Sequence, residues 1–187
     1  NHGTGIILKG GRVLTAKHVL TEKAKEGKKQ ILLTTTDGRG FPAEIIKEGE
    51  KDWAMLQITG KESQEMAMKS PVVMGKATSK QITAFFGYPA RLGLDEKGRV
   101  KSFHQGNETK GVPASKLSPL LVVATVSDPE AMKLKPLAGF PPVGGMSGGP
   151  VLNIEGKVIG VQNSVSKTTE DATGKVLSYT INATPTS

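Results

Sequence analysis

Cysteine is missing from the 187-residue chain. Its absence excludes disulfide bonds, thiolate metal sites and every mechanism that needs a cysteine nucleophile. Aromatic residues make up only 4% of the sequence, so there is little material for the platforms on which single-stranded nucleic acids stack. No apolar run in the sequence approaches about 20 residues, so we expect no membrane-spanning helix.

The net charge of the chain is +8, because 25 Lys and Arg residues stand against 17 Asp and Glu. A basic face can bind nucleic acid or another polyanion, with an affinity that falls steeply as salt rises. An excess of this size is more typical of a soluble, lysine-rich surface. We therefore expect no nucleic-acid partner, and a basic nucleic-acid-binding β-barrel is kept as an alternative.

Glycine and proline punctuate the chain, with 23 and 11 copies spread along it. Hairpin turns need such residues, and short β-type runs lie between turn pairs such as Gly10-Gly11 and Asp37-Gly38, which favours an all-β protein. The pattern predicts strands over residues 4–8, 12–15, 30–36, 41–47, 53–58, 81–86, 120–126, 151–154, 157–161 and 176–181. Loops are predicted over the lysine-rich segment 21–29, the polar segment 91–116 and the proline-bearing segment 128–143.

A serine between glycines forms the sharpest motif of the sequence, in the segment GGMSGGP at 144–150. Small neighbours leave the Ser147 hydroxyl reachable, and the N–H groups of Gly145 and Ser147 can form an oxyanion hole. Taken alone, the segment could equally be a glycine-rich hairpin loop. The G-x-S-x-G elbow of α/β-hydrolases is excluded, because it needs a helix after the serine and a histidine downstream. Here Pro150 and a β-type run follow, and all three histidines come earlier.

If Ser147 acts with a histidine and an aspartate, the only order along the sequence that remains is His, Asp, Ser. The order of subtilisin needs an aspartate before the histidine, and the first aspartate here is Asp37, well after His18. His18 directly follows a predicted strand, where a base can be held rigidly. Asp52 begins an apolar run, where a carboxylate can orient an imidazole and stabilise its charged form. Each of these residues on its own is more typical of an ordinary surface or turn position.

Three blocks in this order resemble the active-site segments of the trypsin-like serine peptidases, which have the chymotrypsin fold. The blocks are Thr15-Ala16-x-His18, Asp52-x-Ala54-x-Leu56 and Gly145-x-Ser147-Gly148-Gly149-Pro150. The segments TGII at 4–7, GYP at 87–89 and GKVIGV at 156–161 are further similar to the cysteine-free bacterial branch that includes the HtrA and glutamyl-endopeptidase relatives. The resemblance covers most of the chain and is weak between residues 91 and 116.

This resemblance implies an all-β fold of two packed antiparallel Greek-key β-barrels, with the active site in the groove between them. The first barrel would span residues 1–76 and the second residues 77–187. The resemblance also implies a serine endopeptidase with His18, Asp52 and Ser147 as catalytic triad and with Gly145 and Ser147 as oxyanion hole. Its substrates would be proteins or peptides, and it would need no metal or cofactor.

The resemblance assigns a further set of positions to the substrate cleft. They are Pro142, Asn163, Ser164, Val165 and Leu177, and none of them carries a charge. Val165 and Leu177 would narrow the pocket for P1, the substrate residue before the cleaved bond. We therefore expect a preference for small or aliphatic P1 side chains.

The residue before Ser147 bears on how such a peptidase is activated. Met146 stands where digestive trypsins carry an aspartate that pairs with a new N-terminal amine, so activation by insertion of the N-terminus is not expected. The chain stops at Ser187 without the C-terminal helix usual in the family, which suggests a piece of a longer protein. We expect a secreted or periplasmic location. A catalytically silent scaffold with the same barrels (a pseudoprotease) and a viral polyprotein-processing peptidase stay open as alternatives.

Overall fold

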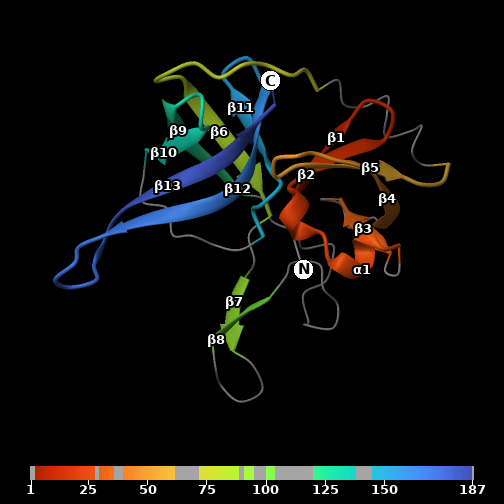
Figure 1. The fold of residues 1–187 in the computed structure, drawn as a ribbon, viewed down its shortest axis with the longest axis horizontal. Coiled ribbons are helices and arrows are strands. Elements are labelled where there is room, and N and C mark those ends of the chain that lie inside the picture. The colour runs from red at the N-terminus through yellow and green to blue at the C-terminus, as the bar shows by residue number, and fades with distance from the viewer. Residues whose placement is uncertain are drawn as a thin grey trace.

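β-strands make up most of the described part of the chain. The structure is a computed structural model, and it describes residues 3–27, 30–35, 40–61, 72–88, 91–94, 100–103, 120–137 and 145–186. Two strand systems lie side by side in Figure 1, a curled sheet of early strands and a closed barrel of later strands. This arrangement confirms the expected all-β architecture of the two-barrel kind.

The first sheet contains β1 (Gly5–Leu8), β2 (Arg12–Thr15), β3 (Ile31–Thr34), β4 (Gly40–Glu48) and β5 (Ala54–Ile58). Its strand order is β1-β2-β5-β4-β3, and all neighbours are antiparallel. β1 and β2 form the predicted hairpin, and its turn has a positive φ at Gly10 and Gly11 (84° and 73°), which glycine adopts at little cost. Alternate residues of β5, namely Ala54, Leu56 and Ile58, are buried in the core of this sheet.

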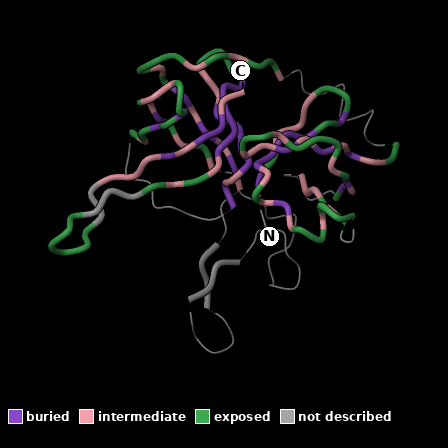
Figure 2. Tube along the Cα trace, viewed as in Figure 1, coloured by how far each residue is buried: buried purple, intermediate pink, exposed green. Residues whose placement is uncertain are grey.

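The second system contains β6 (Ile82–Gly87), β9 (Leu120–Asp128), β10 (Lys133–Pro136), β11 (Pro150–Asn153), β12 (Val158–Thr169) and β13 (Val176–Pro185). Its order is β10-β13-β12-β11-β6-β9, and pairing of β9 with β10 closes the barrel. The core inside it includes Phe85, Met132, Leu134, Met146 and Ile181, each at most 1% exposed. Figure 2 shows buried residues gathered in both strand systems.

A third apolar cluster joins the two systems. Leu14 and Ala16, at and just after the end of β2, pack with Val161 of β12. Because these residues come from both systems, their burial holds the end of β2 against the barrel. Residues 73–75 also run beside β12, since the Val158 N–H donates to the Val73 carbonyl at 2.9 Å. The expected domain boundary between residues 76 and 77 stays a prediction.

Several segments predicted as loops contain regular structure. α1 (Glu22–Lys25) lies within 21–29, because the Thr21 hydroxyl accepts the Ala24 N–H at 3.1 Å and caps the start of the helix. β10 lies within 128–143, because its backbone pairs with both β9 and β13, which no local pattern announces. β7 (Arg91–Leu94) and β8 (Val100–Phe103) form a hairpin within 91–116.

The ends of two other predictions also differ from the structure. β12 continues to Thr169, well past the predicted end at 161, and forms with β13 the long arm that leaves the barrel in Figure 1. The predicted Asp37-Gly38 turn lies outside the described residues, although β3 and β4 pair on either side of it. In the described ranges, no helix has the length and apolarity to cross a bilayer.

Candidate active site

His18 and Asp52 meet at the edge where β2 ends and β5 begins. Thr15 of β2 pairs with Ala54 of β5, so the residues just beyond these strand ends lie close together. His18 is on the short helix η1 (Lys17–Val19), and its Nδ1 lies 2.6 Å from Asp52 Oδ2. Its backbone N–H donates to Asp52 Oδ1 at 2.9 Å. One residue thus engages both carboxylate oxygens, which fixes the orientation of the imidazole.

The pair is open to a substrate. The His18 side chain is 49% exposed and the Asp52 side chain is 30% exposed. With the proton of the neutral ring on Nδ1, facing the carboxylate, Nε2 has a free lone pair. Nowhere in the described ranges do three or more His, Asp or Glu side chains gather as metal ligands would.

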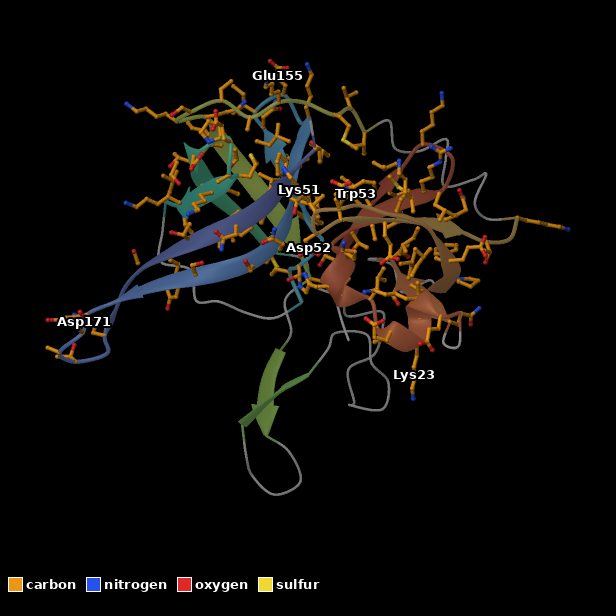
Figure 3. The ribbon with its side chains drawn as sticks, in the orientation of Figure 1. Lys23, Lys51, Asp52, Trp53, Glu155 and Asp171 are labelled. Atoms are coloured by element: carbon orange, nitrogen blue, oxygen red, sulfur yellow. The ribbon has the colours of Figure 1, made fainter. Side chains whose placement is uncertain are left out.

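The turn that carries Asp52 is itself held in place. Lys17 Nζ donates to the Gly49 carbonyl at 2.7 Å, and the Gly49 N–H donates to the Trp53 carbonyl at 2.9 Å. The indole of Trp53 lies against Gly49, where an added Cβ would meet ring atoms at 2.1 Å, so only glycine fits. Figure 3 shows Lys51, Asp52 and Trp53 between the barrel and the first sheet.

Ser147 lies in a tight loop that leads into β11. The neighbouring Met146 side chain is 1% exposed and belongs to the barrel core. The Met146 carbonyl accepts the Gly149 N–H at 3.0 Å, and the Gly148 N–H donates to the Gln162 carbonyl of β12 at 2.7 Å. Because each peptide unit is planar, these bonds fix the orientation of the backbone on both sides of Ser147.

The Ser147 loop packs against the segment that carries His18. A Cβ at Gly148 would lie 2.3 Å from Thr15 Oγ1 and 2.9 Å from the Ala16 nitrogen, and Gly148 has a φ of +91°. A side chain at this position would clash with the backbone and strain the loop. The absence of a side chain at Gly148 therefore allows the loop to lie against the end of β2.

Hydrogen bonds connect Ser147 to Asp52 through two residues of the barrel. Ser147 Oγ donates to the Asn163 carbonyl at 3.1 Å, and no hydrogen bond joins it to the described side chain of His18. Asn163 Nδ2 donates to Thr184 Oγ1 at 3.0 Å, and Thr184 Oγ1 donates to the Asp52 carbonyl at 3.3 Å. Sequence reasoning missed the buried Thr184, because a threonine in a strand is common and carries no local signal.

The two N–H groups predicted as oxyanion hole donate to no acceptor among the described residues. They belong to Gly145 and Ser147. Gly145 has a φ of +94°, a conformation that favours glycine. Within the described ranges, neither N–H group is thus engaged by another acceptor.

Two of the predicted cleft residues lie in a bulge of β12 beside the Ser147 hydroxyl. The register with β13 shifts between Gln162 and Ser164, which leaves Asn163 as the extra residue. The exposed Ser164 hydroxyl donates to Asn163 Oδ1 at 3.0 Å and accepts from Asn182 Nδ2 at 3.1 Å. The bulge re-aims the Asn163 carbonyl toward Ser147.

The other predicted cleft residues are placed differently. Val165 is half-buried, packs against the barrel core and pairs with Ile181 of β13. Leu177 lies on β13 farther along the arm, between Val176 and Ser178, which pair with Thr169 and Thr168. The distance along the strand from the level of Val165 is about 10–13 Å. The strand pairing therefore brings Ile181, and not Leu177, beside Val165. Pro142 lies outside the described residues.

Gln162 is a buried polar residue that sequence reasoning also missed. It is 2% exposed, and it pairs with Ala183 of the barrel core, which places its side chain on the inner face of β12. Its Oε1 atom has no hydrogen-bond partner within the described ranges. An unpaired buried acceptor costs roughly 1–3 kcal/mol, so this oxygen would gain from any donor that reaches it.

Comparison with known proteins provides a test of the family that is independent of this geometry. No individual curated protein matches the chain. A family model described as trypsin-like peptidase domain matches residues 3–161, a range that contains His18, Asp52 and Ser147. Because this match covers well over half of its residues, the chain belongs to the trypsin-like peptidase domain family and is a peptidase of that kind.

Proposed function

We propose that this peptidase is a serine endopeptidase whose catalytic triad is His18, Asp52 and Ser147. The observation that supports it best is the double hydrogen bond from His18 to Asp52, beside the loop that carries Ser147. A carboxylate at Nδ1 keeps the ring proton on that atom and leaves Nε2 as the base. The carboxylate also stabilises the imidazolium that forms when Nε2 takes a proton.

The reaction begins with attack of Ser147 Oγ on the carbonyl carbon of the peptide bond. To reach His18, the hydroxyl leaves the Asn163 carbonyl by rotation about χ1, which a partly exposed side chain completes within nanoseconds. His18 Nε2 takes the hydroxyl proton as the new C–O bond forms, and it then gives the proton to the leaving amine. Water hydrolyses the acyl-enzyme, again with His18 as base.

The N–H groups of Gly145 and Ser147 would bind the oxygen that becomes negative during the attack. Donors aimed at this developing charge act in the transition state, and each is typically worth about a hundred- to a thousand-fold in rate. These protein groups suffice for acyl transfer, so we expect the reaction to need no metal or cofactor.

An active-site serine probe tests the nucleophile directly. We expect a fluorophosphonate to label the wild-type chain at Ser147, as located by mass spectrometry of its peptides, because only an activated serine reacts readily. The Ser147→Ala variant should not be labelled. Ser127→Ala removes another serine hydroxyl, on β9, and should be labelled like the wild type. A folded wild-type chain that resists labelling would contradict the proposal and favour the silent scaffold.

We further propose that the P1 pocket takes small or medium uncharged side chains. Asn163 and Ser164 would offer main-chain groups to the substrate backbone, as an edge strand does. Val165, which packs on the barrel core, would narrow the pocket for P1. We also assign Gln162 Oε1 to this pocket, because it is an acceptor without a partner in the described ranges and its strand carries Asn163 and Val165; this acceptor would extend the preference from Ala and Val to Ser and Thr.

A peptide library tests this specificity. We expect kcat/KM to be highest for Ala, Val, Ser or Thr at P1 and at least about ten-fold lower for Lys, Arg, Asp or Glu. The reason is that a charge buried without a partner is strongly unfavourable. A library in which a charged P1 residue leads would contradict the pocket assignment, and it would leave the triad untouched.

A further inference from the structure

Thr4 uses every polar group it has, although it is only 4% exposed. Its N–H donates to the Ser147 carbonyl at 2.7 Å, and its hydroxyl donates to the Gly145 carbonyl at 2.8 Å. The same hydroxyl accepts the Tyr88 N–H at 2.9 Å. The Thr4 carbonyl accepts the Thr15 hydroxyl at 2.7 Å.

These four bonds connect three separate parts of the molecule. Gly145 and Ser147 belong to the loop before β11, Tyr88 follows β6 of the barrel, and Thr15 ends β2, three residues before His18. Thr4 lies 141 residues from Gly145 in the sequence. Thr4 therefore connects the loop that carries Ser147 to β2, the strand that leads to His18.

The bonds from Thr4 fix the two peptide planes that flank the Ser147 N–H. Its hydroxyl holds the plane that contains the Gly145 carbonyl, and its N–H holds the plane that contains the Ser147 carbonyl. Between them, the Met146 carbonyl is held by Gly149, so the Ser147 N–H points away from that bond. Gly145 has no side chain to restrict rotation of its backbone. The orientation of the peptide plane that contains the Gly145 carbonyl therefore depends most on the Thr4 hydroxyl.

We propose that Thr4 is a positioning residue that orders the oxyanion-binding N–H groups of Gly145 and Ser147. Its hydroxyl would serve in place of the aspartate that Met146 replaces. This inference rests on the proposed function, because it assigns those two N–H groups to the transition state. Loss of the hydroxyl should lower kcat and leave KM nearly unchanged, since a misplaced oxyanion hole weakens transition-state binding and spares substrate binding.

Two substitutions at Thr4 isolate the hydroxyl. Thr4→Val keeps the shape and the backbone bonds but removes the hydroxyl, while Thr4→Ser keeps the hydroxyl. Thr83→Val is the matched control, because Thr83 is also a buried threonine, at 2% exposed. Its hydroxyl donates to the Ala124 carbonyl at 3.1 Å, between β6 and β9 of the barrel. All variants are compared per folded molecule, with the folded fraction taken from thermal unfolding.

We expect kcat and the rate of fluorophosphonate labelling to fall about ten- to a hundred-fold in Thr4→Val, with KM within about two-fold of wild type. This is part of the loss that deletion of one oxyanion donor causes. Thr4→Ser should recover most of both rates, and Thr83→Val should keep both rates while losing stability.

Three results would overturn the inference. One is a folded Thr4→Val with the wild-type kcat, and another is a loss of kcat that Thr83→Val shares. The third is a loss that Thr4→Ser fails to restore. In each of these the wild type still hydrolyses peptides, so the proposed function survives. A folded wild type that neither cleaves peptides nor reacts with the probe would instead overturn both proposals together.

Discussion

Replacing His18 with alanine is expected to lower kcat for peptide hydrolysis by a factor on the order of 10⁶. Without the imidazole, the Ser147 hydroxyl has no base to take its proton, and the leaving amine has no acid to protonate it. The half-exposed ring adds little to packing, so the variant should fold normally. The measurement is kcat by peptide cleavage, with circular dichroism and thermal unfolding to confirm the fold.

A matched control for this prediction lies on α1. Lys23 is an exposed side chain close in sequence to His18, and Figure 3 shows it at the periphery of the first sheet, away from Asp52. Lys23→Ala should therefore retain wild-type kcat. If His18→Ala kept more than about one hundredth of the wild-type kcat, His18 would not be the base.

Replacing Asp52 with asparagine should lower kcat by about 10⁴ while changing KM little. An amide oxygen can still accept the His18 backbone N–H, so the turn should keep its shape. The amide group that remains cannot stabilise an imidazolium, and its NH₂ favours the ring tautomer with the proton on Nε2, which is the wrong one for a base. The measurement is kcat and KM at a pH where the wild type is fully active.

Asp128→Asn is the control for the loss of a carboxylate. Asp128 Oδ1 accepts the N–H groups of Glu130 and Ala131 at 3.1 Å, in a turn at the end of β9. This substitution should leave kcat at the wild-type value. A loss of activity in Asp52→Asn that is caused by unfolding would show as a lower melting temperature, and it would count against the orienting role.

Local pattern was a good guide to the strands that carry their own signal. β2 (Arg12–Thr15) and β5 come from short β-type runs that follow a glycine and a charged residue respectively, and both lie within one residue of the expected positions. β10 has the sequence KLKP, in which only Leu134 is apolar, and it becomes a strand because β9 and β13 offer backbone partners on both sides. A pairing of this kind is a long-range event that a short window of sequence does not contain.

The arm of β12 and β13 illustrates a similar limit for the substrate cleft. The register of these strands decides which residue of β13 lies beside Val165, and a bulge at Asn163 shifts that register by one residue. The resemblance assigned Val165 and Leu177 to the same pocket. The strand pairing puts Ile181 beside Val165, and the assignment of Leu177 to the pocket stays a prediction. The narrower likeness to the cysteine-free bacterial branch stays a prediction.

The amino-acid sequence already limits the chemistry open to this protein. It contains no cysteine, it permits only the order His, Asp, Ser, and it places glycines around Ser147 where a side chain would clash. The way in which these groups are held depends on the fold. Thr4 and Thr184 are ordinary threonines in the sequence, and each makes long-range hydrogen bonds because its hydroxyl is buried at a junction of the two strand systems. A buried hydroxyl must find partners wherever the fold places it, and the carbonyl to which each of these hydroxyls donates lies more than a hundred residues away along the chain.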